Sequence, residues 1–147
     1  MLTTPPIADV AGHLRLVLAR TARRLRQEAA GADLSPSMIS ALASVDRHGP
    51  LTPSELAAHE RVQRPTITRV LSRLDELGLI DRAPDPADRR SSLISASAEG
   101  RTLLHRQRSR KDQYLAHRLE TLDADEVATL ERAAAILERM LDEEGRR

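Results

Sequence analysis

The sequence predicts a mainly α-helical protein that carries one small β-hairpin. Apolar residues recur every three or four positions through most of the 147-residue chain, as in amphipathic helices. Only residues 79–97 replace this spacing, with two short runs around a turn-rich loop. Phe, Trp and Cys are absent and Tyr occurs once, so the core must be built from Leu, Ile, Val, Ala and Met, which suits close-packed helices.

The most informative helix is expected over Arg64 to Leu77. On a helix of about 3.6 residues per turn, one face is apolar (Ile67, Val70, Leu71, Leu74, Leu77) and the opposite face carries Pro65, Thr68, Arg69 and Ser72. The polar face combines arginines with small hydroxyls and has no acidic residue before Asp75. Such side chains can enter a DNA groove, although an ordinary solvated helix face explains these residues equally well.

A basic hairpin is expected directly after this helix. Gly78 is a natural helix C-cap, and Leu79–Ala83 and Ser91–Ser97 have the composition of two paired strands. The loop between them, Pro84–Arg90, holds two prolines and two aspartates and ends in two arginines. A helix followed by a basic hairpin predicts a winged helix and favours DNA binding over a merely solvated face.

The same region resembles the MarR family of bacterial transcription regulators. The resemblance rests on LTPSELAAHERV (Leu51–Val62), TITRVLSRL (Thr66–Leu74), LGLIDR (Leu77–Arg82) and the family's Asp-x-Arg wing signature, matched by Asp88, Arg89 and Arg90. It is continuous through the DNA-binding core and weaker in the flanking helices. It implies a winged helix-turn-helix and a helical dimerisation region formed by the N- and C-terminal helices.

The turn before the DNA-binding helix departs from the family pattern. The family tends to have a leucine followed by a glycine where this chain has Glu60 and Arg61. Glycine adopts a left-handed backbone conformation at little cost, whereas arginine does not. The resemblance therefore leaves the angle between these two helices unspecified.

Local signals predict where the helices begin and divide the chain into three parts. Asp9 and Ser35 are expected as N-caps of the first two helices, and Ser97 as that of the helix after the hairpin, where Gly100 should cost some stability. Capping boxes are expected at Thr52 and Glu55 and at Asp123 and Glu126. The parts are an N-terminal dimerisation helix (1–34), the winged helix-turn-helix (35–97) and C-terminal dimerisation helices (98–147).

The two terminal helices carry apolar faces that need a partner. The first helix contributes Val10 and Leu14, and the last has a coiled-coil-like seam of Val127, Leu130, Ala134, Leu137 and Leu141. Packing inside one subunit would satisfy these faces. The family resemblance implies instead a two-fold dimer.

The expected DNA-binding residues lie on the recognition helix and the wing. Helix-turn-helix proteins make base contacts from the N-terminal half of this helix, which selects Gln63, Arg64, Pro65, Thr66, Thr68, Arg69 and Ser72, with Arg73 further along on the phosphate backbone. The resemblance implies that Arg90 enters the minor groove. Arg89 would then contact phosphate, and Asp88 would orient an arginine by a charge-assisted hydrogen bond.

The predicted function is regulation of transcription by a homodimer on double-stranded DNA. Two modules related by a two-fold axis fit half-sites about 34–36 Å apart, so the operator should be an imperfect palindrome. A repressor is expected, although the sequence does not decide between repressor and activator. The resemblance implies lipophilic or phenolic effectors between the dimerisation region and the winged helix. The sequence identifies no pocket residue, and the scarcity of aromatic residues leaves open that no effector is used.

Composition argues against other classes. The net charge is +1, but residues 61–111 hold twelve basic and six acidic side chains, as expected of a DNA-contacting centre. The five histidines lack metal-ligand spacing and no nucleophile or phosphate loop stands out, so neither an enzyme, a metal site nor a cofactor is expected. No apolar run spans a membrane and no signal peptide is apparent, which predicts a soluble cytoplasmic protein.

The main alternative is a dimeric protein-interaction module whose winged helix no longer reads DNA. Substitution of Arg89 and Arg90 discriminates between the two functions, because it should cripple a DNA binder and leave such a module intact.

Overall fold

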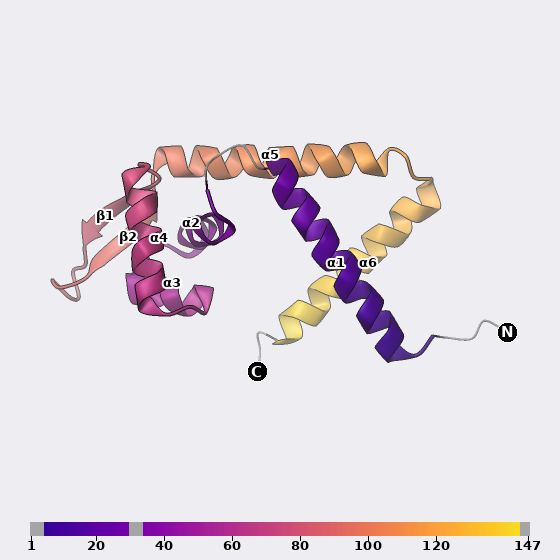
Figure 1. Cartoon of the computed structure of the whole chain (residues 1–147), viewed down its shortest axis with the longest axis horizontal. Helices are drawn as coiled ribbons and strands as arrows, with labels where there is room; N and C mark the ends of the chain where they lie inside the picture. The colour runs from indigo at the N-terminus through magenta and orange to yellow at the C-terminus, as the bar shows by residue number, and fades with distance from the viewer. Residues whose placement is uncertain (1–4, 30–33, 145–147) are drawn as a thin grey trace. The chain divides into compact units, whose positions relative to one another are not determined.

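The computed structural model of the chain contains helices and one hairpin in the predicted order (Figure 1). It describes residues 5–29 and 34–144, without the side chains of the last two. The elements are α1 (Ile7–Ala29), α2 (Pro36–His48), α3 (Pro53–Glu60), α4 (Arg64–Glu76), β1 (Ile80–Pro84), β2 (Ser92–Ala96), α5 (Ala98–Leu119) and α6 (Ala124–Glu144). The chain forms two compact units, residues 1–111 and 112–147.

Helices α2 and α3 begin where the sequence predicted. The Ser35 hydroxyl accepts a hydrogen bond from the Met38 N–H at 3.3 Å. At α3, Thr52 Oγ1 accepts from the Glu55 N–H at 3.2 Å while the Glu55 carboxylate accepts from the Thr52 N–H at 2.7 Å. The hydrogen bond from the Thr52 N–H, helped by the Thr52 side chain, stabilises the ionised carboxylate and holds the pKa of Glu55 below its ordinary value.

The prediction for α1 was wrong by three residues. The helix begins at Ile7, and the carbonyl oxygen of Pro6 accepts hydrogen bonds from the N–H groups of Asp9 and Val10 at 3.0 and 3.2 Å. Asp9 therefore lies in the first turn instead of capping the helix. An acidic side chain is favourable at either place because of the helix dipole, so the sequence signal did not separate them.

Helix α6 has the predicted capping box. The Asp123 carboxylate accepts from the Glu126 N–H at 2.8 Å, and the Glu126 carboxylate accepts from the Asp123 N–H at 3.0 Å. The start of α6 is thus fixed by contacts within four residues of sequence, which explains why it could be predicted.

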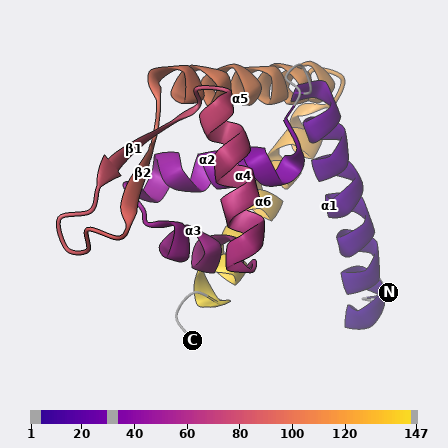
Figure 2. The same cartoon turned by 60° about the vertical axis from the view of Figure 1, so that its left-hand side comes forward.

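Helices α2, α3 and α4 enclose an aliphatic core beside the hairpin (Figure 2). The largest fully buried side chains are Leu42, Val45, Leu56, Ile67, Leu71, Leu74 and Ile94. The predicted apolar stripe of α4 is therefore correct for its central part. Val70 is half-buried, but Leu77 is 41% exposed, because the helix ends there at the turn to β1.

The hairpin is antiparallel and attached to the helices by a third segment. Its register runs from Ile80 opposite Ala96 to Pro84 opposite Ser92. Leu51, just before α3, exchanges two backbone hydrogen bonds with Ile94, at 3.0 and 2.7 Å. The wing is thus anchored at its base to the segment that leads into α3.

Helix α5 packs very closely against the base of the wing. The Ser97 hydroxyl accepts from the Gly100 N–H at 3.0 Å, so Ser97 is the predicted cap. A Cβ atom on Gly100 would lie 2.2 Å from the carbonyl oxygen of Leu79 and 3.2 Å from a methyl group of Leu42. Gly100, expected only to weaken the helix, is therefore required by this close approach of two backbones.

We predict that Gly100→Ala destabilises the protein by about 2–3 kcal/mol, since the added methyl group must displace backbone and not a flexible side chain. Urea unfolding followed by circular dichroism measures this change. Gly12→Ala is the matched control: nothing lies within 4 Å of its Cβ position in α1, so it should stabilise by up to about 1 kcal/mol. Equal effects of the two substitutions would contradict the packing argument.

Candidate nucleic-acid interface

The polar face of α4 is fully available to a ligand. All residues predicted for base and phosphate contact on this helix are exposed: Gln63, Arg64, Pro65, Thr66, Thr68, Arg69, Ser72 and Arg73. The face is held in place from behind by Ile67, Leu71 and Leu74, which are at most 1% exposed. An exposed row of donors on a firmly packed helix can be presented to a groove with little reordering.

Several of these side chains are oriented by neighbours. Thr68 Oγ1 donates to the carbonyl oxygen of Arg64 at 3.0 Å, one turn earlier. Arg73 forms an ion pair with Glu76 at 2.9 Å. The Arg73 guanidinium is therefore partly neutralised towards the C-terminal end of α4, away from the half of the helix predicted to read bases.

The tip of the wing is shaped by aspartates acting on the backbone. The Asp88 carboxylate accepts from the Arg90 N–H at 2.9 Å, and Asp85 does the same for the Ala87 N–H at 2.9 Å. Asp88 thus positions Arg90 through its main chain and not, as the sequence suggested, through a guanidinium. Arg89 and Arg90 are both exposed at this tip.

A polar concavity of about 200 Å³ lies between the wing and α4. It is lined by Pro53, Arg64, Thr68, Leu71, Arg82, Arg90, Ser91 and Ser92. Arginines from α4, β1 and the wing line it together, and the Arg64 guanidinium donates a hydrogen bond to the Ser54 hydroxyl at the start of α3. Such an arrangement suits an anionic oxygen ligand such as a phosphate.

Sequence reasoning missed Arg82 and Ser54. Arg82 stood within the matched LGLIDR stretch, but only the antiparallel register, which places it opposite Ile94, shows that it lies beside the arginines of α4 and the wing. Its guanidinium is ion-paired with Asp75 at 2.8 Å, which fixes the base of the wing to the end of α4.

Comparisons with known proteins agree with this architecture. The family model described as MarR family matches residues 34–92. An uncharacterized HTH-type transcriptional regulator of Mycobacterium bovis is 38% identical over 136 residues, covering 92% of this chain and 95% of the relative. The multiple antibiotic resistance protein MarR of Salmonella typhimurium is 36% identical over 100 residues, covering 67% of this chain and 69% of that protein.

The chain belongs to the MarR family. A crystal structure of a transcriptional regulator from Pseudomonas aeruginosa PA01 is 35% identical, superposes with a TM-score of 0.84 and covers 93% of this chain and 98% of that one. The predicted fold class, mainly helical with a winged helix-turn-helix, is confirmed. This MarR family member is a DNA-binding transcriptional regulator, and its relatives are regulators and not enzymes.

The MarR family chain also carries two apolar helix faces, one in each compact unit. Val10 and Leu14 of α1 are 40% and 43% exposed. On α6, Leu137 is half-buried and the other seam residues, Val127, Leu130, Ala134 and Leu141, are exposed. Within the chain these faces are not buried as a core would be.

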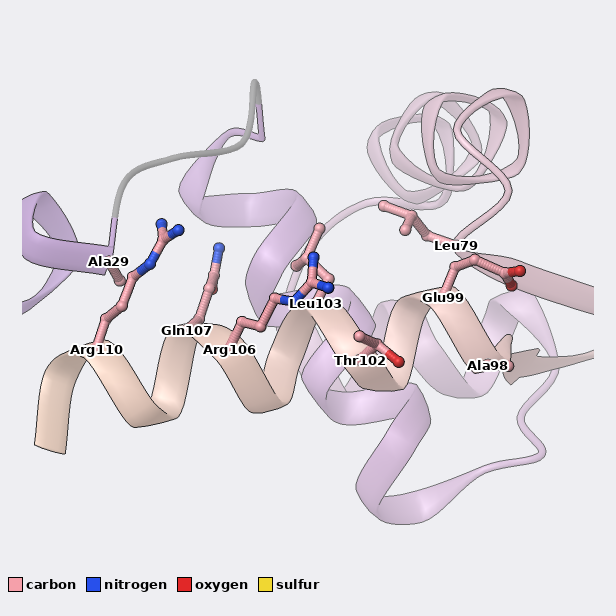
Figure 3. A pocket seen from close by; sticks show the side chains of 9 residues that line it. All are labelled: Ala29, Leu79, Ala98, Glu99, Thr102, Leu103, Arg106, Gln107 and Arg110. Atoms are coloured by element: carbon pink, nitrogen blue, oxygen red, sulfur yellow. The ribbon is translucent and has the colours of Figure 1, made fainter.

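A groove runs along α5 in the first unit. Two adjoining cavities, of about 460 and 590 Å³, share Ala29 and Gln107 in their walls. Figure 3 shows Arg106, Gln107 and Arg110 projecting from the same side of α5, with Ala29 of α1 opposite Arg110. The second cavity adds the cationic side chains of Arg26 and Lys111 to an apolar lining.

In the described part of the chain, no group of three or more His, Cys, Asp or Glu side chains is arranged to hold a metal ion. The helices described are too short or too polar to cross a membrane.

Proposed function

We propose that this MarR family protein is a homodimeric repressor that binds an imperfect palindrome, with α4 in the major groove and the wing beside it. The observation that carries the proposal is the exposed polar face of α4 next to the concavity of Arg64, Arg82 and Arg90. Repression would follow where the operator overlaps a promoter, because the bound dimer excludes the polymerase.

The dimensions of the interface support this docking. The 13 residues of α4 extend for about 20 Å at about 1.5 Å per residue, enough to cross a major groove about 12 Å wide. Gln63, Thr66 and Arg69 on its first half would read bases. The exposed pair Arg73–Glu76 contributes little to stability, so a phosphate can replace Glu76 as the partner of Arg73.

The wing would add contacts on either side of this groove. Arg90 at the exposed tip is proposed for the minor groove, and Arg89 for a phosphate. The concavity between α4 and the wing, with Arg82 at its base, would take a further backbone phosphate. Phosphate contacts of this kind position the protein, and the α4 contacts supply the sequence preference.

Dimerisation is proposed through the exposed faces of α1 and α6. Large apolar side chains on α6 are exposed, among them Leu130 at 49% and Leu141 at 67%. Their burial against a second copy would stabilise the dimer. A two-fold dimer would also present two α4 helices, as a palindromic operator requires.

We predict that Arg90→Ala weakens binding to DNA from upstream of the protein's own gene by roughly 1–3 kcal/mol, since the guanidinium loses a groove contact. Fluorescence anisotropy at several salt concentrations, with a scrambled duplex alongside, measures this loss. Arg15→Ala, on exposed α1, removes the same charge elsewhere and should change affinity little.

The same experiment tests the alternative function. If the wild type and Arg90→Ala both bind the upstream and the scrambled duplex equally weakly, the upstream region does not contain an operator. That result would favour the protein-interaction module. A reporter gene under the upstream region then tests the sign of regulation: deletion of the regulator should raise its expression, and a fall would identify an activator.

The proposed dimer predicts that Leu130→Glu produces a monomer, because a charge in the centre of the α6 seam cannot be solvated when that face is covered. Sedimentation equilibrium measures the mass, and operator affinity should fall with it. Ala128→Glu adds the same charge on the opposite side of α6, where it is exposed, and should remain dimeric. A monomeric wild type would overturn the dimer itself.

An effector is proposed for the groove along α5. Its volume suits a small molecule. Its largely apolar walls carry one carboxylate, that of Glu99, and four cationic side chains, those of Arg26, Arg106, Arg110 and Lys111, which together favour a lipophilic anion over a neutral phenol. Differential binding to two dimer conformations would then alter the spacing of the α4 helices.

We predict that 1-naphthoate displaces the protein from the upstream duplex at concentrations at least tenfold lower than the neutral 1-naphthamide, because only the acid forms charge-assisted hydrogen bonds. Arg110→Gln should reduce this difference, whereas Arg118→Gln, also on α5 but outside the groove, should not. Anisotropy competition measures both. Equal potency of the two compounds would show that the cations do not select the ligand.

A further inference from the structure

Arg61 adopts a backbone conformation that arginine rarely uses. Its φ and ψ are 55° and 41°, and it is the one non-glycine residue with positive φ in the part of the chain that the structure describes. Arg61 caps the C-terminal end of α3. Its N–H donates to the carbonyl oxygen of Ala58 at 3.2 Å, and the Val62 N–H donates to the carbonyl oxygen of Ala57 at 3.1 Å. This is the left-handed position at a helix C-terminus that glycine normally occupies.

No side-chain contact among the described residues offsets this strain. In the described residues, the Arg61 side chain is exposed and forms neither an ion pair nor a hydrogen bond. The neighbouring Glu60 carboxylate is already bonded to the Ser44 hydroxyl across the α2–α3 contact. The two capping hydrogen bonds would form equally well with glycine at this position, so the arginine side chain gives the described fold nothing in return for its left-handed backbone. Such outliers point to a role outside the fold.

The position of Arg61 indicates what that role is. It lies three residues before Arg64, so their Cα atoms are at most about 10 Å apart. Arg64 begins α4, the helix proposed for the major groove, and donates to Ser54 at the start of α3. Arg61 therefore lies on the turn directly before α4. With α4 in the major groove, this turn would approach the rim of the groove, where phosphates and not base edges are exposed.

We propose that Arg61 is a phosphate-contacting residue, and that its strained conformation exchanges stability of the free protein for affinity to DNA. The inference rests on the proposed docking of α4 in the major groove. Because the contact is to the sugar-phosphate backbone, it should strengthen binding to every duplex by the same factor and leave sequence preference unchanged.

Four variants of the full-length protein separate strain from charge. Arg61→Gly and Arg61→Asn both relieve the left-handed strain and remove the charge. Arg61→Lys retains the left-handed strain and the positive charge. Arg15→Ala removes a charge from α1 and controls for net charge. Each is measured by thermal unfolding and by anisotropy on the upstream and scrambled duplexes between 50 and 200 mM KCl.

The expected result is an opposite change in stability and affinity. Arg61→Gly should raise Tm by about 2–4 °C and weaken binding to both duplexes equally. A plot of log affinity against log salt concentration should have a slope about 0.9 shallower per protomer for Arg61→Gly than for the wild type. Between 50 and 200 mM KCl, each phosphate contact present only in the wild type should therefore cost it about 3.5-fold more affinity than the variant loses. Arg61→Asn should behave similarly, and Arg61→Lys like the wild type.

Two results would overturn the inference alone: a wild type that binds the upstream duplex with a steep salt dependence that Arg61→Gly shares, or an equal loss in Arg15→Ala. A lowered Tm in Arg61→Gly would refute the exchange of stability for affinity. A wild type that binds neither duplex would remove the proposed docking of α4, and this inference with it.

Discussion

The recognition helix, the wing and α5 all depend on one buried hydroxyl group, that of Ser97. It is 4% exposed, donates to the carbonyl oxygen of Gly78 at 2.6 Å and accepts from the Gly100 N–H at 3.0 Å. The Ser97 N–H donates to the carbonyl oxygen of Leu79 at 3.0 Å. Since a buried polar atom left unbonded costs about 1–3 kcal/mol, the end of α4, the last residue of the wing and the start of α5 cannot move independently. The geometry of the DNA-binding surface is therefore tied to the long helix behind it.

The arginines of this surface fall into two groups by their partners. Arg73 and Arg82 are ion-paired with acidic residues at the C-terminal end of α4, at 2.9 and 2.8 Å. Arg64 and Arg69 lie on the first half of the helix, and no acidic residue occurs between Arg61 and Leu74. Positive charge is thus least neutralised where the helix would enter DNA. Exposed ion pairs contribute at most about 1 kcal/mol, so the paired arginines can still exchange a carboxylate for a phosphate.

The groove along α5 adjoins the Ser97 junction. One of its two cavities is lined by Leu79, Ala98 and Glu99, which lie beside the residues that hold the end of α4 and the base of the wing. A ligand in this cavity would contact the first turn of α5. Because Gly100 leaves no space between α5 and the backbone of Leu79, a displacement of that turn would be transmitted to the wing. This gives the proposed effector a physical route to the DNA-binding surface, through packed backbone.

The sequence by itself determined the helix starts at Ser35, Thr52 and Asp123, the hairpin and the exposed polar side of α4. Caps are contacts within three residues, and a buried stripe at helical spacing fixes the opposite face. Only the tertiary structure decided that Arg82 lies beside the arginines of α4 and the wing, that Gly100 is required against Leu79, and that Arg61 takes the left-handed conformation. The first two depend on residues distant in the chain, and the third on how two packed helices constrain the turn between them. Local patterns carry no information about such constraints.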